Sequence, residues 1–431
     1  MTSHHFMSSL LKNKFFNSVF KIASGTAVSQ LILAISIPII ARLYLPEQIG
    51  ILSVYLSFFN FWIAVVTWRY ENALFLAKTK SESIHIFRVG MICCLVTSAF
   101  TFPILKLLID YETLGFQVVP SWSTYFSTIS LFFFGLFVLY RAWLVRLANW
   151  RAVNISLISK SLSNVSLKIL SGFVSPTVIG LFIAELASCI FAWWTSRSRV
   201  MQFTRLVSTR WNRKRMKAIA VKHKKFALYE TPSTALNQLA TTLPVPMIGS
   251  LYGAEAAGLF AMARLLCAIP ISQLGKAIGD VFQQELSGLI RQKELIRGKR
   301  LFYRLSLYLS GIGLFILLIT LLFAEPLVNL IFGSSWQGMG KIIVHISPWM
   351  FMVLVVSSLS RALSLLNRQE LKLIYDVVSL AVVLTSYYLA NDIGSNIIEF
   401  INMLTVGLSV SYVIYYLIIV YSFHSKAKLS N

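Results

Sequence analysis

The chain has 431 residues, of which 57% are hydrophobic and only 13% are charged. A composition this apolar excludes a soluble globular domain. The formal net charge of +23 would indicate a nucleic-acid partner only if the basic residues formed a soluble basic face. The sequence contains no such face, so we expect no nucleic acid to bind.

The apolar residues occur in blocks of about 20, each long enough to cross about 30 Å of hydrocarbon as a helix. The sequence therefore predicts an all-α polytopic membrane protein with about twelve transmembrane helices, six in each half. The predicted helices cover residues 18–41, 48–68, 88–108, 120–140, 152–173, 174–195, 228–251, 256–282, 301–324, 337–360, 370–390 and 396–421.

The stretch 26–50 occurs a second time at 234–258 without a gap, so the chain contains two copies of one unit. An even number of helices per copy makes the copies parallel, and membrane folds built from repeats place the substrate site at the repeat interface, which favours a transporter. We expect bundles at 1–200 and 226–431, joined by a basic linker at 201–225. Nine residues recur 208 positions later, namely Thr26, Ala27, Gln30, Leu31, Pro38, Leu43, Tyr44, Glu47 and Gly50.

Most of the 39 basic residues lie at the two termini and in the loops after even-numbered helices. Lys and Arg in short loops are retained on the cytoplasmic side during insertion, so both termini are predicted to be cytoplasmic. The basic loop 196–225 is expected to lie on anionic membrane lipids. Four basic residues are expected at the opposite ends, at Arg42, Lys106, Lys168 and Lys341.

Gln30 in the first helix and Gln238 in the seventh lie at the same predicted depth. The pair either lines a polar cavity or ties neighbouring helices together. Pro38 and Pro246 lie nearer the outer ends of these helices, where each proline frees a carbonyl and bends the helix.

Arg69 and Glu71 follow the second helix at the cytoplasmic face. They form either a gate ion pair or an interfacial anchor. Glu230 in the seventh helix and Asp376 in the eleventh are further acids near or inside the membrane, and a buried carboxylate can carry a proton in a coupled cycle. His345 in the tenth helix is more typical of a structural hydrogen-bonding residue.

The fifth helix carries a polar stripe that includes Ser156, Lys160 and Ser163, a face that does not suit lipid. A cation inside the span costs about 2.5 to 3.5 kcal/mol, so Lys160 needs a partner. Two alternatives remain: an ion pair with Glu185 of the sixth helix, or a cavity that binds an anion.

Arg264 is about ten residues, or about 15 Å, from the outer end of the eighth helix, which places it close to the midplane. Its planar, permanently charged fork matches phosphate oxygens, although a structural bond to helix-end carbonyls is the alternative. Lys276 and Asp280 are four residues apart on the same helix and could simply pair near the inner interface.

The sequence contains no P-loop, no metal-ligand cluster and no nucleophile elbow. We therefore expect neither catalysis nor a cofactor nor a metal.

Four segments resemble a known family: 23–50, WRYENALFLAK at 68–78, RAWLVRLANWR at 141–151 and, most fully, 229–287, which begins YETPSTALNQLATTLPVP. Through them the chain resembles the bacterial polysaccharide-transporter family, which includes the Wzx-type O-antigen flippases. That family shares a superfamily with multidrug and toxic compound extrusion proteins and murein-precursor flippases. Asn72 departs from the family pattern, which commonly continues with an apolar run after RYE.

This resemblance implies two six-helix bundles arranged as a V around a central cavity in the bacterial inner membrane. It implies a flippase that moves an oligosaccharide on undecaprenyl pyrophosphate to the outer leaflet by alternating access, with ion coupling. A polysaccharide polymerase and a chain-length regulator are the expected protein partners. Arg264, Lys160, the serine stripe and the two glutamines would bind the lipid-linked oligosaccharide. The alternatives are a multidrug antiporter of the same fold and a non-transporting scaffold for polysaccharide assembly.

Overall fold

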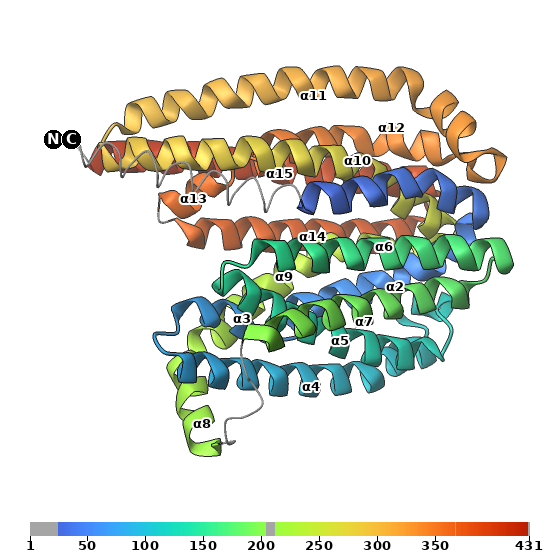
Figure 1. Ribbon diagram of the computed structural model, residues 1–431. Coiled ribbons are helices and arrows are strands. Elements are labelled where there is room, and N and C mark those ends of the chain that lie inside the picture. The colour runs from blue at the N-terminus through green and yellow to red at the C-terminus, as the bar shows by residue number, and fades with distance from the viewer. Residues whose placement is uncertain (1–24, 204–211, 367, 430–431) are drawn as a thin grey trace. The chain divides into compact units, whose positions relative to one another are not determined.

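The structure is a computed structural model that describes residues 25–203, 212–366 and 368–429 (Figure 1). The ends of the chain and residues 204–211 of the basic loop lie outside the described residues, and so do the parts of the predicted topology that rest on them. After a first helix at Gly25–Leu43, the longer α-helices are α2 (Pro46–Val65), α4 (Lys80–Asp110), α5 (Ser123–Arg146), α6 (Trp150–Val174), α7 (Val178–Phe203), α8 (Arg213–Lys222), α9 (Thr231–Thr242), α10 (Pro244–Arg291), α11 (Leu295–Phe332), α12 (Met339–Met352), α14 (Gln369–Ile393) and α15 (Ile397–Leu429).

Short helical segments fill the connections between these helices. They are the α-helices α3 (Tyr70–Ala73) and α13 (Arg361–Leu365), the 3₁₀ turns η1 (Leu74–Leu76), η2 (Thr113–Val118) and η4 (Ser334–Trp336), and the π-helical turns η3 (Phe226–Glu230) and η5 (Val353–Ser357).

Within the described part of the chain, ten helical segments are long and apolar enough to cross a membrane. One of them, Phe226–Arg291, has 66 residues, which is enough for the predicted seventh and eighth helices together. The serine-rich α6 is not among the ten, but its 25 residues are enough for one crossing. The predicted all-helical membrane fold is therefore confirmed, with the twelve predicted spans accounted for.

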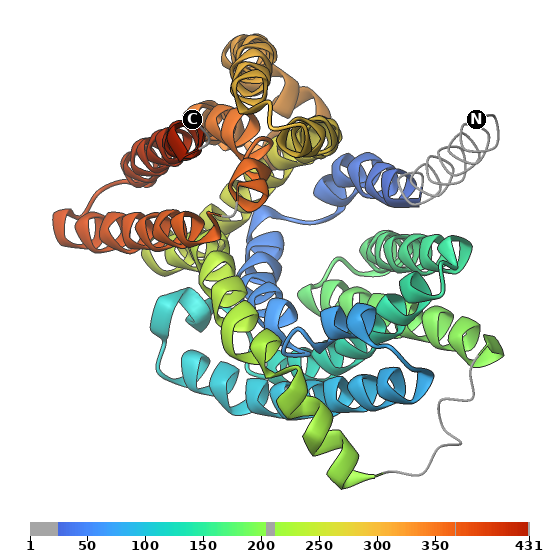
Figure 2. The same cartoon turned by 90° about the vertical axis from the view of Figure 1, so that its left-hand side faces the viewer.

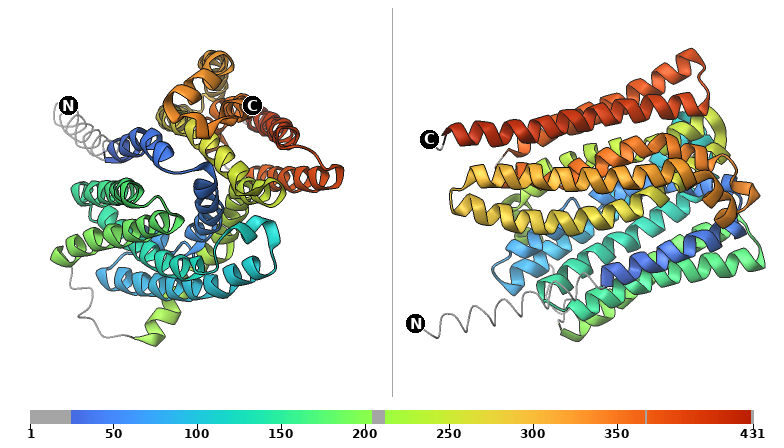
Figure 3. Two further views of the ribbon diagram at one scale, coloured as in Figure 1. Left: turned by 90° about the vertical axis from the view of Figure 1, so that its right-hand side faces the viewer. Right: turned by 90° about the horizontal axis from the view of Figure 1, so that it is seen from above.

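The described residues divide into two compact units, one within 1–44 and 55–235 and the other within 45–54 and 236–431. The helix packing of one unit recurs in the other, as the internal repeat predicts. The contacts of α4 with α5, α5 with α7 and α6 with α7 correspond to those of α11 with α12, α12 with α15 and α14 with α15. Figures 2 and 3 show α6 beside α7 in green, and α14 beside α15 in red.

The repeated tyrosines Tyr44 and Tyr252 have equivalent roles at the turn that follows the first helix of each copy. The Tyr44 hydroxyl donates to the carbonyl of Lys168, 2.9 Å away, and lies 2.8 Å from Ser171 near the end of α6. The Tyr252 hydroxyl lies 3.2 Å from Ser395, just after α14. Each tyrosine therefore attaches its turn to the fifth helix of its own half.

The seventh and eighth predicted spans differ from the structure in their boundary. The helix begins with a π-helical turn and α9, and α10 then starts at Pro244 and continues through the end of the seventh predicted span and the whole of the eighth to Arg291. The predicted turn between the spans remains as a local break at Gly253, whose φ of 87° is outside the helical region. A glycine tolerates this φ because it has no Cβ.

Candidate functional site

The second unit contains a cavity of about 380 Å³ that is bordered mainly by α10, α12, η5 and α13. Its charged lining residues are Arg264, Lys276 and Arg361, and no acidic residue is among the described residues that line it. Because all its charges have one sign, the cavity favours an anion. We call it the cationic cavity; Trp349, Ser357, Ser358 and Tyr412 also line it.

A glycine pair explains why Arg361 reaches this cavity. A Cβ on Gly275 would lie 2.8 Å from the hydroxyl of Ser358, and one on Gly279 would lie 2.9 Å from the Ser358 carbonyl oxygen. The sequence GKAIG at 275–279 therefore lets α10 approach the segment before α13 closely, as small residues four apart do at membrane helix contacts. The GxxxG spacing of Gly275 and Gly279 is the sequence signal for this close approach, and Arg361 was not among the predicted site residues.

Arg264 lies on α10 with its guanidinium carbon 5.7 Å from the centre of the Trp349 ring and near Tyr412. No carboxylate of the described residues forms a salt bridge with it. A cation–π contact partly stabilises the charge but leaves the N–H donors of the fork available. Arg264 therefore lines the cationic cavity with donors that are available to an anion.

The ion pair between Lys276 and Asp280 that the spacing allows is not formed. Asp280 instead pairs with Arg361, which also donates to the side chain of Gln283 at 2.8 Å. Lys276 is exposed and lines the cationic cavity. The spacing of four residues permits the pair of Lys276 with Asp280, but the tertiary packing brings Arg361 of α13 to Asp280, and the fork of Arg361 makes more directed bonds than an ammonium does.

Asp376 in α14 is 1% exposed, which makes it the most buried acid of the second unit. Its Oδ1 accepts a hydrogen bond of 2.8 Å from Asn237 on α9, and its Oδ2 is 3.8 Å from Lys372 Nζ. A buried carboxylate with so few donors is an expensive arrangement that is typical of a functional group.

In the first unit, Arg69 contacts Glu71, the partner that the sequence offers for it, and also Glu230, which the sequence predicts only as a separate acid. Its guanidinium donates to Glu230 at 3.0 and 3.1 Å and lies 3.4 Å from Glu71. Asn72 donates to the same Glu230 oxygen at 2.6 Å, and Thr67 donates to Glu71. We call these five residues the charge cluster. Asn72, the departure from the family pattern, thus has a polar role.

The backbone at the charge cluster is unusual. Trp68 and Arg69 have φ values of 51° and 60°, in the left-handed region, which costs non-glycine residues about 1 kcal/mol or more each. Trp68 is held by a 3.0 Å hydrogen bond to Thr97 of α4. This turn directs Arg69 towards Glu230, an orientation that a regular continuation of α2 would not give.

The serine hydroxyls in the polar stripe of α6 form hydrogen bonds to carbonyls of their own helix. Ser156 donates to the Val153 carbonyl and Ser163 to the Ser159 carbonyl, each at 2.7 Å. Lys160 has its Nζ 5.0 Å from the centre of the Phe134 ring.

Glu185 pairs with Lys168 at 2.6 Å, not with Lys160, and both side chains of this pair are nearly buried. Lys168 lies inside α6 and not at a loop end, which corrects the predicted position. Of the two alternatives for Lys160, the ion pair with Glu185 is therefore not formed.

Three other polar residues have simple surroundings. Gln30 and Gln238 are half-buried, and the structure shows no hydrogen bond from either amide side chain to another described residue. The Nδ1 of His345 is 2.7 Å from the side-chain oxygen of Asn402, so the predicted structural role of this histidine agrees with its contact.

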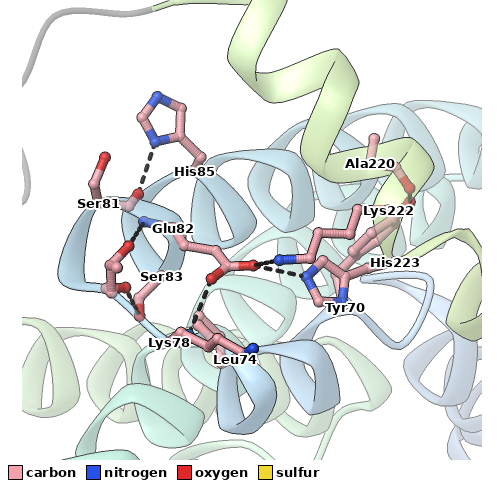
Figure 4. Close-up of polar contacts among 12 residues, drawn as sticks. Tyr70, Leu74, Lys78, Ser81, Glu82, Ser83, His85, Ala220, Lys222 and His223 are labelled. Atoms are coloured by element: carbon pink, nitrogen blue, oxygen red, sulfur yellow. Dashed lines mark hydrogen bonds and ion pairs between the residues drawn. The ribbon is translucent and has the colours of Figure 1, made fainter.

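The described end of the basic linker forms α8, which contacts α4 (Figure 4). Lys222 Nζ is 2.5 Å and His223 Nε2 is 3.2 Å from the carboxylate of Glu82, and Tyr70 donates to the Ala220 carbonyl. This part of the linker is therefore held against the first unit.

Comparisons with known proteins agree with this architecture. A family model described as "Polysaccharide biosynthesis protein" matches residues 39–341, which is more than half of the chain. A curated relative from Klebsiella pneumoniae, an "uncharacterized membrane protein in cps region", is 22% identical over 69% of this chain. The match covers 60% of that protein's own length.

Two solved structures share the fold. An inward-facing multidrug resistance MATE family transporter superposes with a TM-score of 0.70 at 13% identity, covering 94% of this chain and 96% of that one. The lipid II flippase MurJ in an inward closed conformation superposes with a TM-score of 0.71 at 12% identity. That match covers 92% of this chain and 86% of the MurJ chain. These likenesses are to the fold alone.

Proposed function

Because the chain belongs to the polysaccharide biosynthesis protein family, we propose that it is a flippase for an oligosaccharide carried on undecaprenyl pyrophosphate. The lipid-linked oligosaccharide passes from the cytoplasmic to the outer leaflet of the bacterial inner membrane by alternating access. The observation that carries this proposal is the cationic cavity, whose charged lining residues are Arg264, Lys276 and Arg361, the last of them paired with Asp280 outside the lining.

The chemistry of the substrate suits this cavity. A diphosphate bears several negative oxygens, which the fork of Arg264 binds in pairs and the ammonium of Lys276 binds as a point charge. Trp349 and the serines of the lining offer a flat ring and hydroxyl groups for sugar. An exporter of organic cations would require an acidic or apolar cavity, so the charge of this one disfavours the multidrug antiporter.

Ion coupling is part of the proposal. Asp376 is the acid that carries the coupling proton or sodium ion. Its carboxylate is buried, and its negative charge is stabilised by only one hydrogen bond from Asn237 and by Lys372 at 3.8 Å. The charge cluster of the first unit acts as the gate, since Arg69 joins segments 161 residues apart in the chain. Opening such a gate exchanges the contacts of Arg69 with Glu230 for water.

Deletion of the gene tests the function directly. We expect lipid-linked repeat units to accumulate on the cytoplasmic leaflet and the surface polysaccharide to disappear, with both restored by the wild-type chain. Unchanged surface polymer together with new sensitivity to cationic drugs would replace the flippase by the multidrug antiporter. Loss of polymer without any accumulation in the inner leaflet would support the assembly scaffold.

A further inference from the structure

A second cavity of the second unit lies directly beside the cationic cavity. It has a volume of about 270 Å³ and is bordered by α10, α11 and α12. Ile271 and Met350 line both cavities, so one layer of side chains separates them. We call the second one the apolar pocket; Leu266, Cys267, Pro270, Leu317 and Phe351 are among its lining residues.

The apolar pocket offers almost no hydrogen-bonding capacity. Its hydroxyl-bearing lining residues are Thr320 and Ser347, and each donates to its own helix, to the carbonyls of Ile316 at 2.8 Å and Val344 at 2.6 Å. Pro348 has no N–H for the Val344 carbonyl, so Ser347 satisfies the acceptor that the proline leaves free. Large cavities with such walls stay dry and accept hydrocarbon.

The position of the pocket selects a membrane-embedded ligand. α11 is largely unburied, with only 11% of its most apolar window buried, and Leu314, Leu318 and Leu322 on it are more than half exposed. In a membrane these side chains face lipid tails, which are as apolar as leucine. A hydrocarbon chain can therefore exchange between the bilayer and the pocket without meeting water.

Hydrocarbon alone gains little by leaving the bilayer for this pocket, because both surroundings are apolar. Occupancy of the apolar pocket therefore requires that the head group of the same molecule is bound in the neighbouring cationic cavity. An anionic head in the cationic cavity raises the effective concentration of its own chain at the pocket, as a short linker does for a second binding site. The shared wall of Ile271 and Met350 makes the two sites close enough for one molecule.

We propose that the apolar pocket binds the first isoprene units of a polyprenyl diphosphate whose diphosphate lies in the cationic cavity. This inference rests on the proposed function. A single prenyl chain fits a pocket of about 270 Å³, whereas a phospholipid brings two chains on one phosphate. The ligand is therefore held by head and chain together, and the pair of cavities selects polyprenyl carriers from the surrounding phospholipids.

The test measures binding to the purified full chain by native mass spectrometry. Leu317→Trp fills the pocket, and Leu318→Trp places the same ring on the lipid-facing side of α11, where Leu318 is 57% exposed. We expect Leu317→Trp to lower the affinity for undecaprenyl diphosphate at least tenfold, while inorganic diphosphate still binds as it does to the wild type. Leu318→Trp should leave both affinities unchanged. Cys267→Leu fills less of the same pocket and should also lower the affinity for undecaprenyl diphosphate.

Two results would overturn the inference. One is a folded Leu317→Trp or Cys267→Leu protein, judged by its thermal transition, that binds undecaprenyl diphosphate like wild type. The other is dioleoyl phosphatidylglycerol binding to wild type as tightly as undecaprenyl diphosphate and losing the same affinity in Leu317→Trp. If the gene deletion confirms flipping and the variants bind normally, the inference fails and the function stands. If the variants lose lipid binding while surface polymer does not depend on the gene, the function fails.

Discussion

Gly50 and Gly258, which occupy equivalent positions in the two sequence repeats, lie against each other in the second compact unit. A Cβ on Gly50 would overlap the carbonyl oxygen of Ala254 and lie 2.9 Å from the nitrogen of Gly258. A Cβ on Gly258 would likewise overlap the carbonyl oxygen of Pro46 and lie 2.9 Å from the nitrogen of Gly50. The contact is therefore reciprocal.

The first prediction concerns this contact. Gly50→Ala and Gly258→Ala should each destabilise the protein by about 1 to 3 kcal/mol, because the obstacle is backbone that must shift. Thermal unfolding in detergent measures the change. Gly311→Ala is the matched control, since nothing lies within 4 Å of its Cβ position in α11 and alanine favours a helix. Equal melting temperatures for Gly50→Ala and Gly311→Ala would contradict the close contact.

The second prediction concerns Arg264. Arg264→Ala should reduce flipping about ten- to a hundredfold, because a hydrogen bond to a charged group contributes about 1.5 to 3 kcal/mol. Arg264→Lys keeps the charge but loses the fork, so it should retain part of the activity. Leaflet-resolved assay of the lipid-linked oligosaccharide measures both. Arg297→Ala, on an exposed side chain of α11, is the control, and normal flipping by inserted Arg264→Ala would remove this residue from the site.

The third prediction concerns the charge cluster. A double-mutant cycle of Arg69→Ala and Glu230→Ala should give a coupling free energy of about 1 kcal/mol, because several directed bonds join partly buried groups. The exposed pair Glu294 and Arg297 should give only about 0.2 to 0.5 kcal/mol. Unfolding in detergent measures both cycles.

A gate role for the cluster makes a further demand on the same variants. Arg69→Ala should lower the flipping rate more than its loss of stability explains, because the contact of Arg69 with Glu230 then no longer closes the path. Additive effects of the two substitutions on flipping would argue for a purely structural cluster.

The fourth prediction separates the two lysines of α6. Lys168→Ala should destabilise the protein, because it leaves Glu185 nearly buried without its partner. Lys160→Ala leaves that pair intact and should lower flipping with little change in the melting temperature. The outcome that would assign Lys160 to structure is a lower melting temperature with flipping at the wild-type rate per folded molecule.

The fifth prediction concerns Asp376. Asp376→Asn keeps an acceptor for Asn237 but removes the charge, so flipping should lose its dependence on the coupling ion gradient. Vesicles with an imposed proton or sodium gradient measure that dependence and identify the ion. Glu399→Gln at the start of α15 is the control, because Glu399 caps the backbone of Asn396. A gradient response in Asp376→Asn equal to that of wild type would exclude Asp376 as the carrier.

The sequence by itself determined the helical membrane class, the number of spans and the internal repeat. Those properties depend on the length, hydropathy and order of residues along one segment, which local pattern records directly. It also indicated Arg264, since a charge deep in a span is visible from its distance to the helix end. The left-handed turn at Trp68 and the partner of Asp280 left no such trace.

Only the tertiary structure decided which charges meet. The sequence places both Lys160 and Lys168 on the fifth helix, where either could pair with Glu185 of the sixth. The way α6 packs against α7 decides that Glu185 pairs with Lys168. Arg69, Asn72 and Glu230 come together only because η3 packs against the turn after α2. Helix periodicity fixes which residues share a face but not the neighbour that the face meets, because that choice depends on packing between helices distant in sequence.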